Sequence, residues 1–254
     1  MKRVKIKNKI LILIVMLACL FTYLILPACA DENKNNSGES SMKETEYYLV
    51  KNGASEYKIV YPEEHGSYID YAAEELRNFM SEATNGVFRT GSDKGLKHTA
   101  DAKYISLGDT SLLESSGIEV DKESLGSDGY KIVTKDQSVY LIGGSTHGTL
   151  FAAYEFLEKQ FGYHFYAENC YDLERNVGNK KLLDFDITKI PSIGVRYMAD
   201  GPLVKNITTQ RRLRSTPVDD LLILSSGSGW HTANFFVPTS KYMESFPQFY
   251  SYNL

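Results

Sequence analysis

The chain of 254 residues contains only three cysteines and a single tryptophan. Cys19 and Cys29 lie in or directly after an apolar N-terminal run, so Cys170 is the only cysteine in the remainder of the chain. One thiol cannot build a disulfide framework or a cysteine-based metal site within one chain. The histidines are scattered without the spacing of metal ligands. We therefore expect no metal ion to be bound.

Outside its first residues, the chain also has no excess of basic over acidic residues. The formal net charge is −4, and residues 1–28 contain five basic and no acidic residues, so the remainder has a charge of −9. Proteins that bind nucleic acid neutralise phosphates with lysine and arginine. The composition therefore excludes nucleic acid as an expected partner.

A dinucleotide-binding loop is missing as well. Residues 143–148 read GGSTHG, which does not have the glycine spacing of that motif. The glycines instead predict a tight turn, with Ser145 capping a helix that follows. We expect no cofactor.

The N-terminus has the layout of a bacterial export signal. Five basic residues occur within residues 2–9, and residues 10–26 are almost wholly apolar. The run then meets Leu26-Pro27-Ala28-Cys29, which resembles the lipobox of bacterial lipoproteins. The resemblance implies cleavage before Cys29 and lipidation of its thiol; an uncleaved anchor helix with an incidental cysteine is the alternative.

Residues 31–41 read DENKNNSGESS and offer no apolar side chain to bury. Such a segment cannot offset its ordering entropy and suits a flexible tether. We therefore predict a signal peptide over 1–28 and a tether over 29–42. The protein would be exported and lipid-anchored at Cys29 to the outer face of the cell membrane.

A folded domain is expected over residues 43–190. Residues 46–50 and 57–61 read as two strands joined by a hairpin loop, and residues 130–134 and 138–142 form a second predicted hairpin. Further strands are expected at 103–107, 163–166 and 182–187, and the polar stretch 91–102 is expected to be a loop.

Apolar residues at helical spacing predict two long helices, over 68–84 and 146–161. Gly162 stands where a left-handed C-terminal cap is needed. Two helices on one face of a mixed β-sheet bury both apolar stripes, which defines an α+β fold.

After Pro191 the composition changes. Residues 193–197 are strand-like, residues 210–214 are rich in charges and amides, and residues 225–229 form a serine- and glycine-rich loop. These pieces do not make a closed core, so we predict a second domain that begins at residue 191 and is cut off at residue 254.

Two stretches carry a family resemblance. The first comprises DGYKI at 128–132, IGG at 142–144 and GTLFAAYEFLE at 148–158. It resembles the N-terminal domains of glycoside hydrolase family 67 α-glucuronidases, of the bacterial domain-of-unknown-function family 4838, and the small domain that precedes hexosaminidase barrels. The second, with GWHT at 229–232 and FPQFYS at 246–251, is similar to a run in the family 4838 proteins.

The resemblance implies an α/β accessory domain followed by a (β/α)8 barrel that acts on carbohydrate. Residues 191–254 would be the start of an incomplete barrel, with catalytic residues at the C-terminal ends of its strands. The two carboxylates that glycoside hydrolysis needs would lie on strands beyond residue 254. We therefore predict no catalytic residue within the chain.

Three residues are candidate substrate contacts. Arg196 would end the first barrel strand, where a guanidinium can grip hydroxyls or a carboxylate, although a surface or inter-strand arginine is the alternative. Trp230 and His231 lie in the glycine-rich loop and could stack on and hydrogen-bond a sugar, or Trp230 could plug a domain interface. Glu155 and Glu158 are expected on a partly solvated helix face, with structural rather than catalytic roles.

Three functions remain open from the sequence. The leading hypothesis is the N-terminal part of an exported carbohydrate-active lipoprotein, by resemblance an α-glucuronidase-like enzyme acting on polysaccharide fragments. The 18 tyrosines also fit a non-catalytic glycan-binding surface lipoprotein, because a tyrosine ring offers a sugar an apolar face and a polar edge. The third possibility is an inactive fragment.

Overall fold

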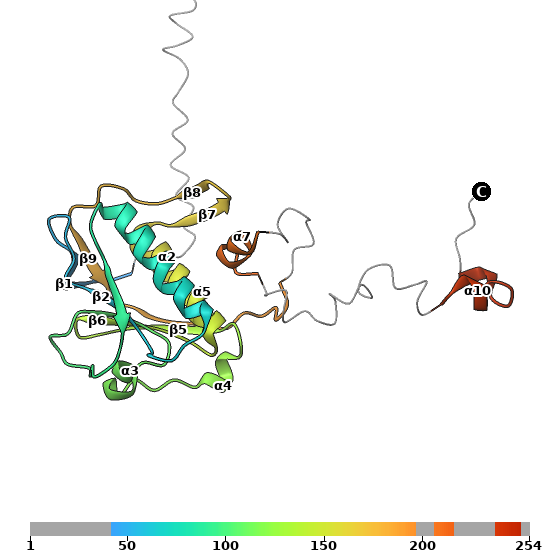
Figure 1. Cartoon of the computed structure of the whole chain (residues 1–254), viewed down its shortest axis with the longest axis horizontal. Coiled ribbons are helices and arrows are strands. Elements are labelled where there is room, and N and C mark those ends of the chain that lie inside the picture. The colour runs from blue at the N-terminus through green and yellow to red at the C-terminus, as the bar shows by residue number, and fades with distance from the viewer. Residues whose placement is uncertain (1–41, 197–205, 216–236, 250–254) are drawn as a thin grey trace, which may run out of the picture. The chain divides into compact units, whose positions relative to one another are not determined.

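A computed structural model describes residues 42–196, 206–215 and 237–249 (Figure 1). Its strands are β1 (Glu44–Val50), β2 (Lys58–Tyr61), β3 (Arg89–Ser92), β4 (Tyr104–Leu107), β5 (Tyr130–Lys135), β6 (Ser138–Gly143), β7 (His164–Ala167), β8 (Cys170–Asp172), β9 (Lys180–Leu183) and β10 (Asp186–Lys189). Its helices are α2 (Ser67–Thr84), α3 (Ser111–Ser116), α4 (Lys122–Leu125), α5 (Thr146–Phe161), α7 (Ile207–Arg212), α10 (Thr239–Tyr242) and a 3₁₀ turn, Pro247–Phe249. Within residues 42–196, 206–215 and 237–249, no helix is both long and apolar enough to cross a membrane.

The central sheet has six strands in the order β10-β5-β6-β4-β2-β3. The four strands β6, β4, β2 and β3 run parallel to one another, whereas β5 and β10 are antiparallel to their neighbours. The β5–β6 hairpin matches the predicted one. The sheet is therefore mixed, as predicted, and the α+β fold class is confirmed.

The predicted hairpin between the first two strands is wrong. β1 pairs with β9 in a separate two-stranded sheet, and β2 lies between β3 and β4 in the central one. Ile59 and Val60 are both fully buried, although they point to opposite faces of β2. A strand covered on both faces belongs inside a parallel sheet rather than in a terminal hairpin.

Two other strand predictions also change. Residues 182–187 contribute to two strands, β9 and β10, which lie in different sheets. The predicted loop at 91–102 begins with the last two residues of β3, which pairs with β2 at the sheet edge. Short polar strands such as RTGS carry little periodic signal.

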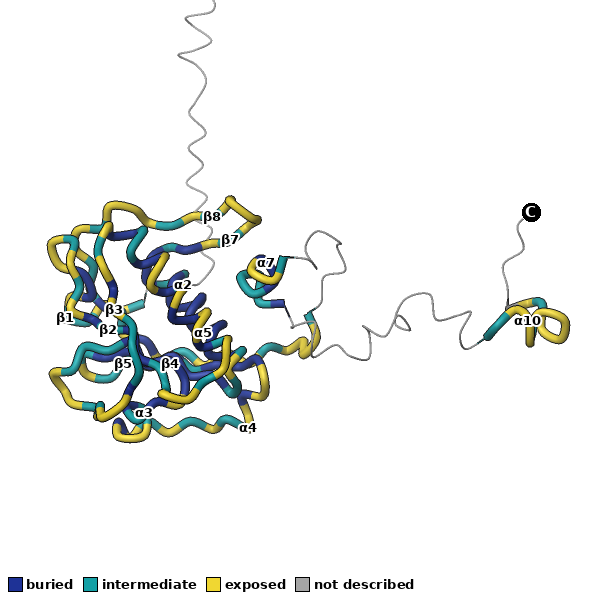
Figure 2. The backbone as a smooth tube through the Cα atoms, viewed as in Figure 1, coloured by how far each residue is buried: buried dark blue, intermediate teal, exposed yellow. Residues whose placement is uncertain are grey.

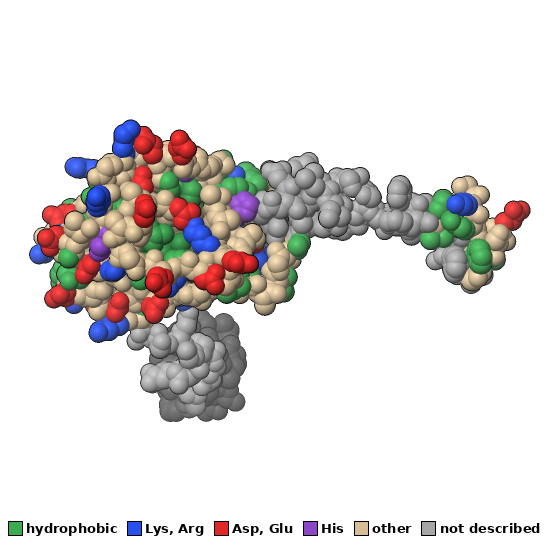
Figure 3. Space-filling model, turned by 90° about the horizontal axis from the view of Figure 1, so that it is seen from below, with side chains coloured by type: hydrophobic (Ala, Val, Ile, Leu, Met, Phe, Trp, Pro, Cys, Tyr) green, Lys and Arg blue, Asp and Glu red, His purple; other side chains and the backbone are tan. Residues whose placement is uncertain are grey.

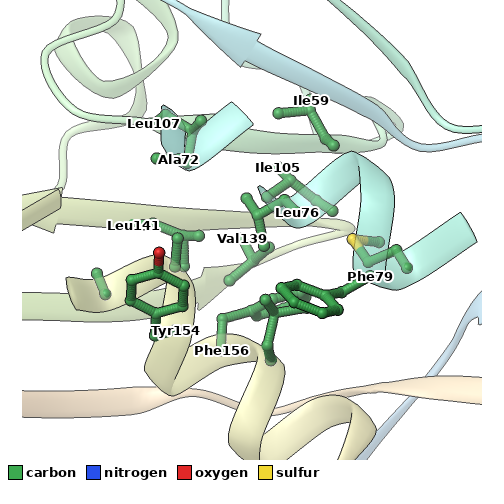
Figure 4. Packing of buried hydrophobic residues seen from close by; sticks show 14 of the residues in the cluster. Ile59, Ala72, Leu76, Phe79, Ile105, Leu107, Val139, Leu141, Tyr154 and Phe156 are labelled. Atoms are coloured by element: carbon green, nitrogen blue, oxygen red, sulfur yellow. The ribbon is translucent and has the colours of Figure 1, made fainter. Parts of the chain in front are cut away.

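Both long helices cover one face of the central sheet, as predicted (Figure 1). Leu76 and Phe79 of α2 and Tyr154 and Phe156 of α5 belong to one apolar cluster, which also includes side chains of β4 and β6 (Figure 4). Twelve of the sixteen residues of α5 are buried, so this helix is enclosed on more than its sheet side. The helix ends agree with the sequence, since Ser145 accepts a hydrogen bond from His147 N and Gly162 is left-handed, with φ of 63°.

The opposite face of the sheet is covered as well. Leu112 of α3 packs with Val60, Tyr140 and Ile142 in a second, smaller apolar cluster. Buried residues recur along the strands of the central sheet and along both long helices (Figure 2). On the outer surface below this layer, acidic and basic side chains are interspersed rather than gathered by sign (Figure 3).

Candidate functional site

Of the predicted site residues, only Arg196 lies in the described part of the structure. Trp230, His231 and Cys29 fall outside the described residues. Residues 193–196 form no strand in the structure, and the side chains of Ile193 and Val195 are exposed. The first barrel strand was predicted over residues 193–197, and the described residues of this range, 193–196, do not form it.

Arg196 connects three segments of the chain. Its Nη2 lies 2.6 Å from Asp128 Oδ2, which precedes β5. Its Nη1 donates to the carbonyl of Ile193 at 2.8 Å, and its Nε donates to the carbonyl of Arg214 at 3.0 Å. Asp128 is 6% exposed, so this ion pair is partly shielded from water and holds the segment after β10 against the domain.

Arg196 also lines a cleft of about 390 Å³ beside β5 and β10. Phe151 of α5, Tyr130 of β5 and Lys189 of β10 form other parts of its wall. The guanidinium of Arg196 lies 5.7 Å from the ring centre of Phe151. A role for Arg196 in binding substrate stays a prediction, whereas its role in fixing the segment after β10 is visible.

The most buried charge in this region is the carboxylate of Glu155, whose side chain has no exposed area. It accepts hydrogen bonds from Tyr130 Oη at 3.0 Å, Lys189 Nζ at 2.7 Å and Arg214 Nη1 at 3.3 Å. The expectation of a partly solvated position for Glu155 is therefore wrong. Helical periodicity could not reveal this, because the covering residues Lys189 and Arg214 lie far away in sequence.

The environment of Glu155 keeps its carboxylate ionised. Burial raises the pKa of a carboxyl, but the hydrogen bond from Lys189 and the charge of Arg214 outweigh burial, and the pKa of Glu155 is lowered. A general acid for glycoside hydrolysis needs a raised pKa instead. The surroundings of Glu155 therefore suit a structural anchor rather than proton transfer.

Glu155 belongs to a larger acidic face on the two long helices, which we define as Glu75 of α2 with Glu155 and Glu158 of α5. Arg212 forms a bidentate ion pair with Glu75, with N–O distances of 2.8 and 2.9 Å. Arg214 reaches Glu158 at 2.7 Å as well as Glu155. The paired charges are partly buried, so water and salt screen their attraction less than that of exposed ion pairs.

Aromatic contacts reinforce this attachment. The guanidinium of Arg211 lies 3.5 Å from the ring centre of Tyr71, and that of Arg212 lies 5.0 Å from Phe79. Thr209 and Gln210 are buried, at 4% and 6% exposure. The basic run at 210–214, which is poor material for an apolar core, is thus held by charge and stacking on the acidic face.

A second hollow of about 280 Å³ lies at the carboxyl ends of β2, β4 and β6, next to the glycine-rich loop. The glycines of that loop are explained by packing. A Cβ on Gly144 would lie 2.0 Å from the carbonyl oxygen of Gly126, and one on Gly143 would lie 2.2 Å from Ser145 O. This close approach of backbones accounts for the sequence GGS without a bound phosphate.

Residues 46–156 match the family model described as the glycosyl hydrolase family 67 N-terminus. These residues comprise α2, the first eleven residues of α5, the four parallel strands of the central sheet and β5. The match covers less than half of the chain and includes the DGYKI segment and most of the GTLFAAYEFLE segment. This part of the chain therefore resembles a glycoside hydrolase family 67 N-terminal domain.

Among solved structures, the chain is similar to a family GH115 4-O-methyl-α-glucuronidase with specificity for decorated arabinogalactans. The TM-score is 0.42 at 14% identity, over 59% of this chain and 19% of that one. It is also similar to a GH138 enzyme targeting pectin rhamnogalacturonan II, with a TM-score of 0.31 at 15% identity, over 56% of this chain and 12% of that one. The chain thus covers at most about a fifth of either enzyme. No curated protein matches the chain.

Proposed function

We propose that this protein is an exported lipoprotein whose folded domain is the accessory N-terminal domain of an α-glucuronidase-like glycoside hydrolase acting on polysaccharide fragments. The observation that carries the proposal is the family 67 N-terminal match over residues 46–156. The accessory domain extends over residues 43–190, and a catalytic (β/α)8 barrel begins at residue 191.

The acidic face supports an accessory role. Glu75, Glu155 and Glu158 each pair with an arginine from the segment that would open the barrel. Glycoside hydrolysis requires two free carboxyl groups on either side of a sugar bond. These three carboxylates are instead occupied in positioning the following segment, so we assign the chemistry to the barrel.

The test is hydrolysis of labelled oligosaccharides, including xylo-oligomers that carry glucuronic acid. We expect release of the uronic acid by a version of the chain extended through the reading frame after Leu254, and none by residues 1–254 alone. Product formation would be followed by chromatography. Lack of turnover by the extended version on every substrate would overturn the enzyme proposal, and glycan binding without turnover would favour the non-catalytic glycan-binding lipoprotein.

Lipid anchoring forms the second part of the proposal and is supported by the sequence around Cys29. In a bacterial host, we expect the wild-type chain to incorporate an alkyne-labelled fatty acid and to sediment with membranes. A Cys29→Ser variant should lose the label. The matched control is Cys170→Ser, because Cys170 is an exposed free thiol on β8. Equal labelling of Cys29→Ser and wild type would refute the anchor.

A further inference from the structure

A cleft of about 490 Å³ lies away from the acidic face, between β1, the loop that follows it and the β5–β6 turn. Tyr47 and Tyr48 of β1 line it, and we call it the tyrosine cleft. Tyr48 is 44% exposed, and Lys51 Nζ lies 5.6 Å from the centre of its ring. A large aromatic side chain is thus presented to solvent inside a hollow rather than packed in the core.

The charges that line the tyrosine cleft cancel. Glu46 and Glu56 contribute two negative charges, and Lys51 and Lys103 contribute two positive ones. Lys103 and Glu56 are themselves paired. A site built for a phosphate or a uronate would carry an excess of positive charge, so the balance favours a neutral ligand.

The remaining polar groups can both donate and accept hydrogen bonds. The amides of Asn52 and Gln137 line the cleft together with the hydroxyl of Ser55. Its volume lies within the usual range for small-molecule sites, but its lining is more polar than in most of them. Neighbouring donors and acceptors around an aromatic ring fit a ligand with many hydroxyl groups and an apolar ring face.

The loop that forms one wall is held in place by the fold. Lys51 and Ala54 exchange two backbone hydrogen bonds, of 2.8 and 3.0 Å. Gly53 N donates to Gly178 O at 2.7 Å, and Asn52 N donates to Asn179 Oδ1 at 3.0 Å. A wall tied to a distant segment loses little conformational freedom when a ligand binds.

We propose that the tyrosine cleft binds a neutral oligosaccharide, with the ring of Tyr48 as the platform on which one sugar ring stacks. The cleft shares no residue with the acidic face, so binding here would hold a polysaccharide on the accessory domain, apart from the barrel. The choice of a saccharide rests on the proposed function, whereas the neutral charge and the position of the site come from the cleft itself.

Isothermal titration calorimetry on the full chain in detergent micelles tests the proposal, with neutral xylo- and gluco-oligosaccharides as probes and oligogalacturonate as the charged comparison. We expect binding of at least one neutral oligosaccharide that exceeds binding of oligogalacturonate. Tyr48→Ala should weaken that binding about tenfold, because it removes the stacking platform. Tyr48→Phe, which keeps the ring, should retain most of it.

The matched control is Tyr166→Ala, since Tyr166 is also an exposed tyrosine, at 59%, but lies on β7. It should leave binding unchanged. Absence of binding by any neutral probe, stronger binding of oligogalacturonate, or equal loss in the control would overturn the tyrosine cleft as the site. If the extended chain hydrolyses oligosaccharides but none binds in the tyrosine cleft, the proposed function stands and the cleft proposal fails. If an oligosaccharide binds in the cleft but none is hydrolysed, the enzyme proposal fails and the cleft proposal stands.

Discussion

Replacing Glu155 by alanine is expected to lower the free energy of unfolding by about 3 kcal/mol. The change removes a carboxylate with no exposed area and leaves Lys189, Arg214 and the hydroxyl of Tyr130 without their shared acceptor. Lys189 is half exposed and can turn to water, which keeps the loss at the lower end of the range for breaking a buried pair. Urea denaturation followed by circular dichroism measures the effect.

Glu158→Ala is the matched control, because Glu158 is on the same helix and pairs with the same arginine but remains 27% exposed. Its loss should be about 1 kcal/mol or less. The effect of Glu155 should also depend on pH. Because its pKa is lower in the folded than in the unfolded protein, its stabilisation is present above the unfolded pKa and disappears as the pH falls through the folded one. The two curves for wild type and Glu155→Ala should therefore begin to approach each other as the pH falls below the unfolded pKa of about 4.3. Equal losses in both variants would contradict a buried anchor.

The long helices were predictable because their signals are local. In α5, Ser145 starts the helix, Gly162 ends it, and the apolar positions between them repeat at helical spacing. The structure places the ends at the residues that these signals mark. The β5–β6 hairpin was predictable for the same reason, since its turn lies between two adjacent strands.

The partners of β1 and β2 could not be predicted in this way. Residues 51–55 contain the turn-forming residues of a hairpin loop. The pairing of a strand, however, is decided by which of its faces must be buried. β2 is apolar on both faces and enters the parallel sheet, which leaves β1 to pair with β9, more than a hundred residues away in sequence. One sequence alone contains no signal for such a distant register.

The same limit applies to the acidic face. The charges of residues 210–214 and the carboxylates of α5 are visible in the sequence, but each looks like a solvated group when read alone. Only the fold brings Arg214 to Glu155 and Glu158, and Arg212 to Glu75. The pairing of one basic run with two helices, together with the stacking of Arg211 on Tyr71 and of Arg212 on Phe79, holds the segment after β10 on this domain.

Gly148, in the first turn of α5, provides the sharpest test of the packing. Alanine is about 1 kcal/mol more favourable than glycine inside a helix, so Gly148→Ala would be stabilising on helix propensity alone. A Cβ at this position, however, would lie 2.3 Å from Gly129 O and 3.1 Å from the Cα of Gly143. Both are backbone atoms, and Gly129 O already accepts a hydrogen bond from Gly144 N, so neither can move cheaply.

Overpacking that displaces backbone costs about 3 kcal/mol, which exceeds the gain in propensity. We therefore expect Gly148→Ala to lower the free energy of unfolding by about 2 kcal/mol in a urea titration. Gly66→Ala is the matched control, because Gly66 precedes α2, has φ of −94° and would place its Cβ in open space. Gly66 is the N-cap of α2, where glycine is preferred to alanine, so that variant should lose about 1 kcal/mol or less. A stabilised Gly148→Ala would mean that the turn at Gly129 does not pack against α5 as closely as the structure shows.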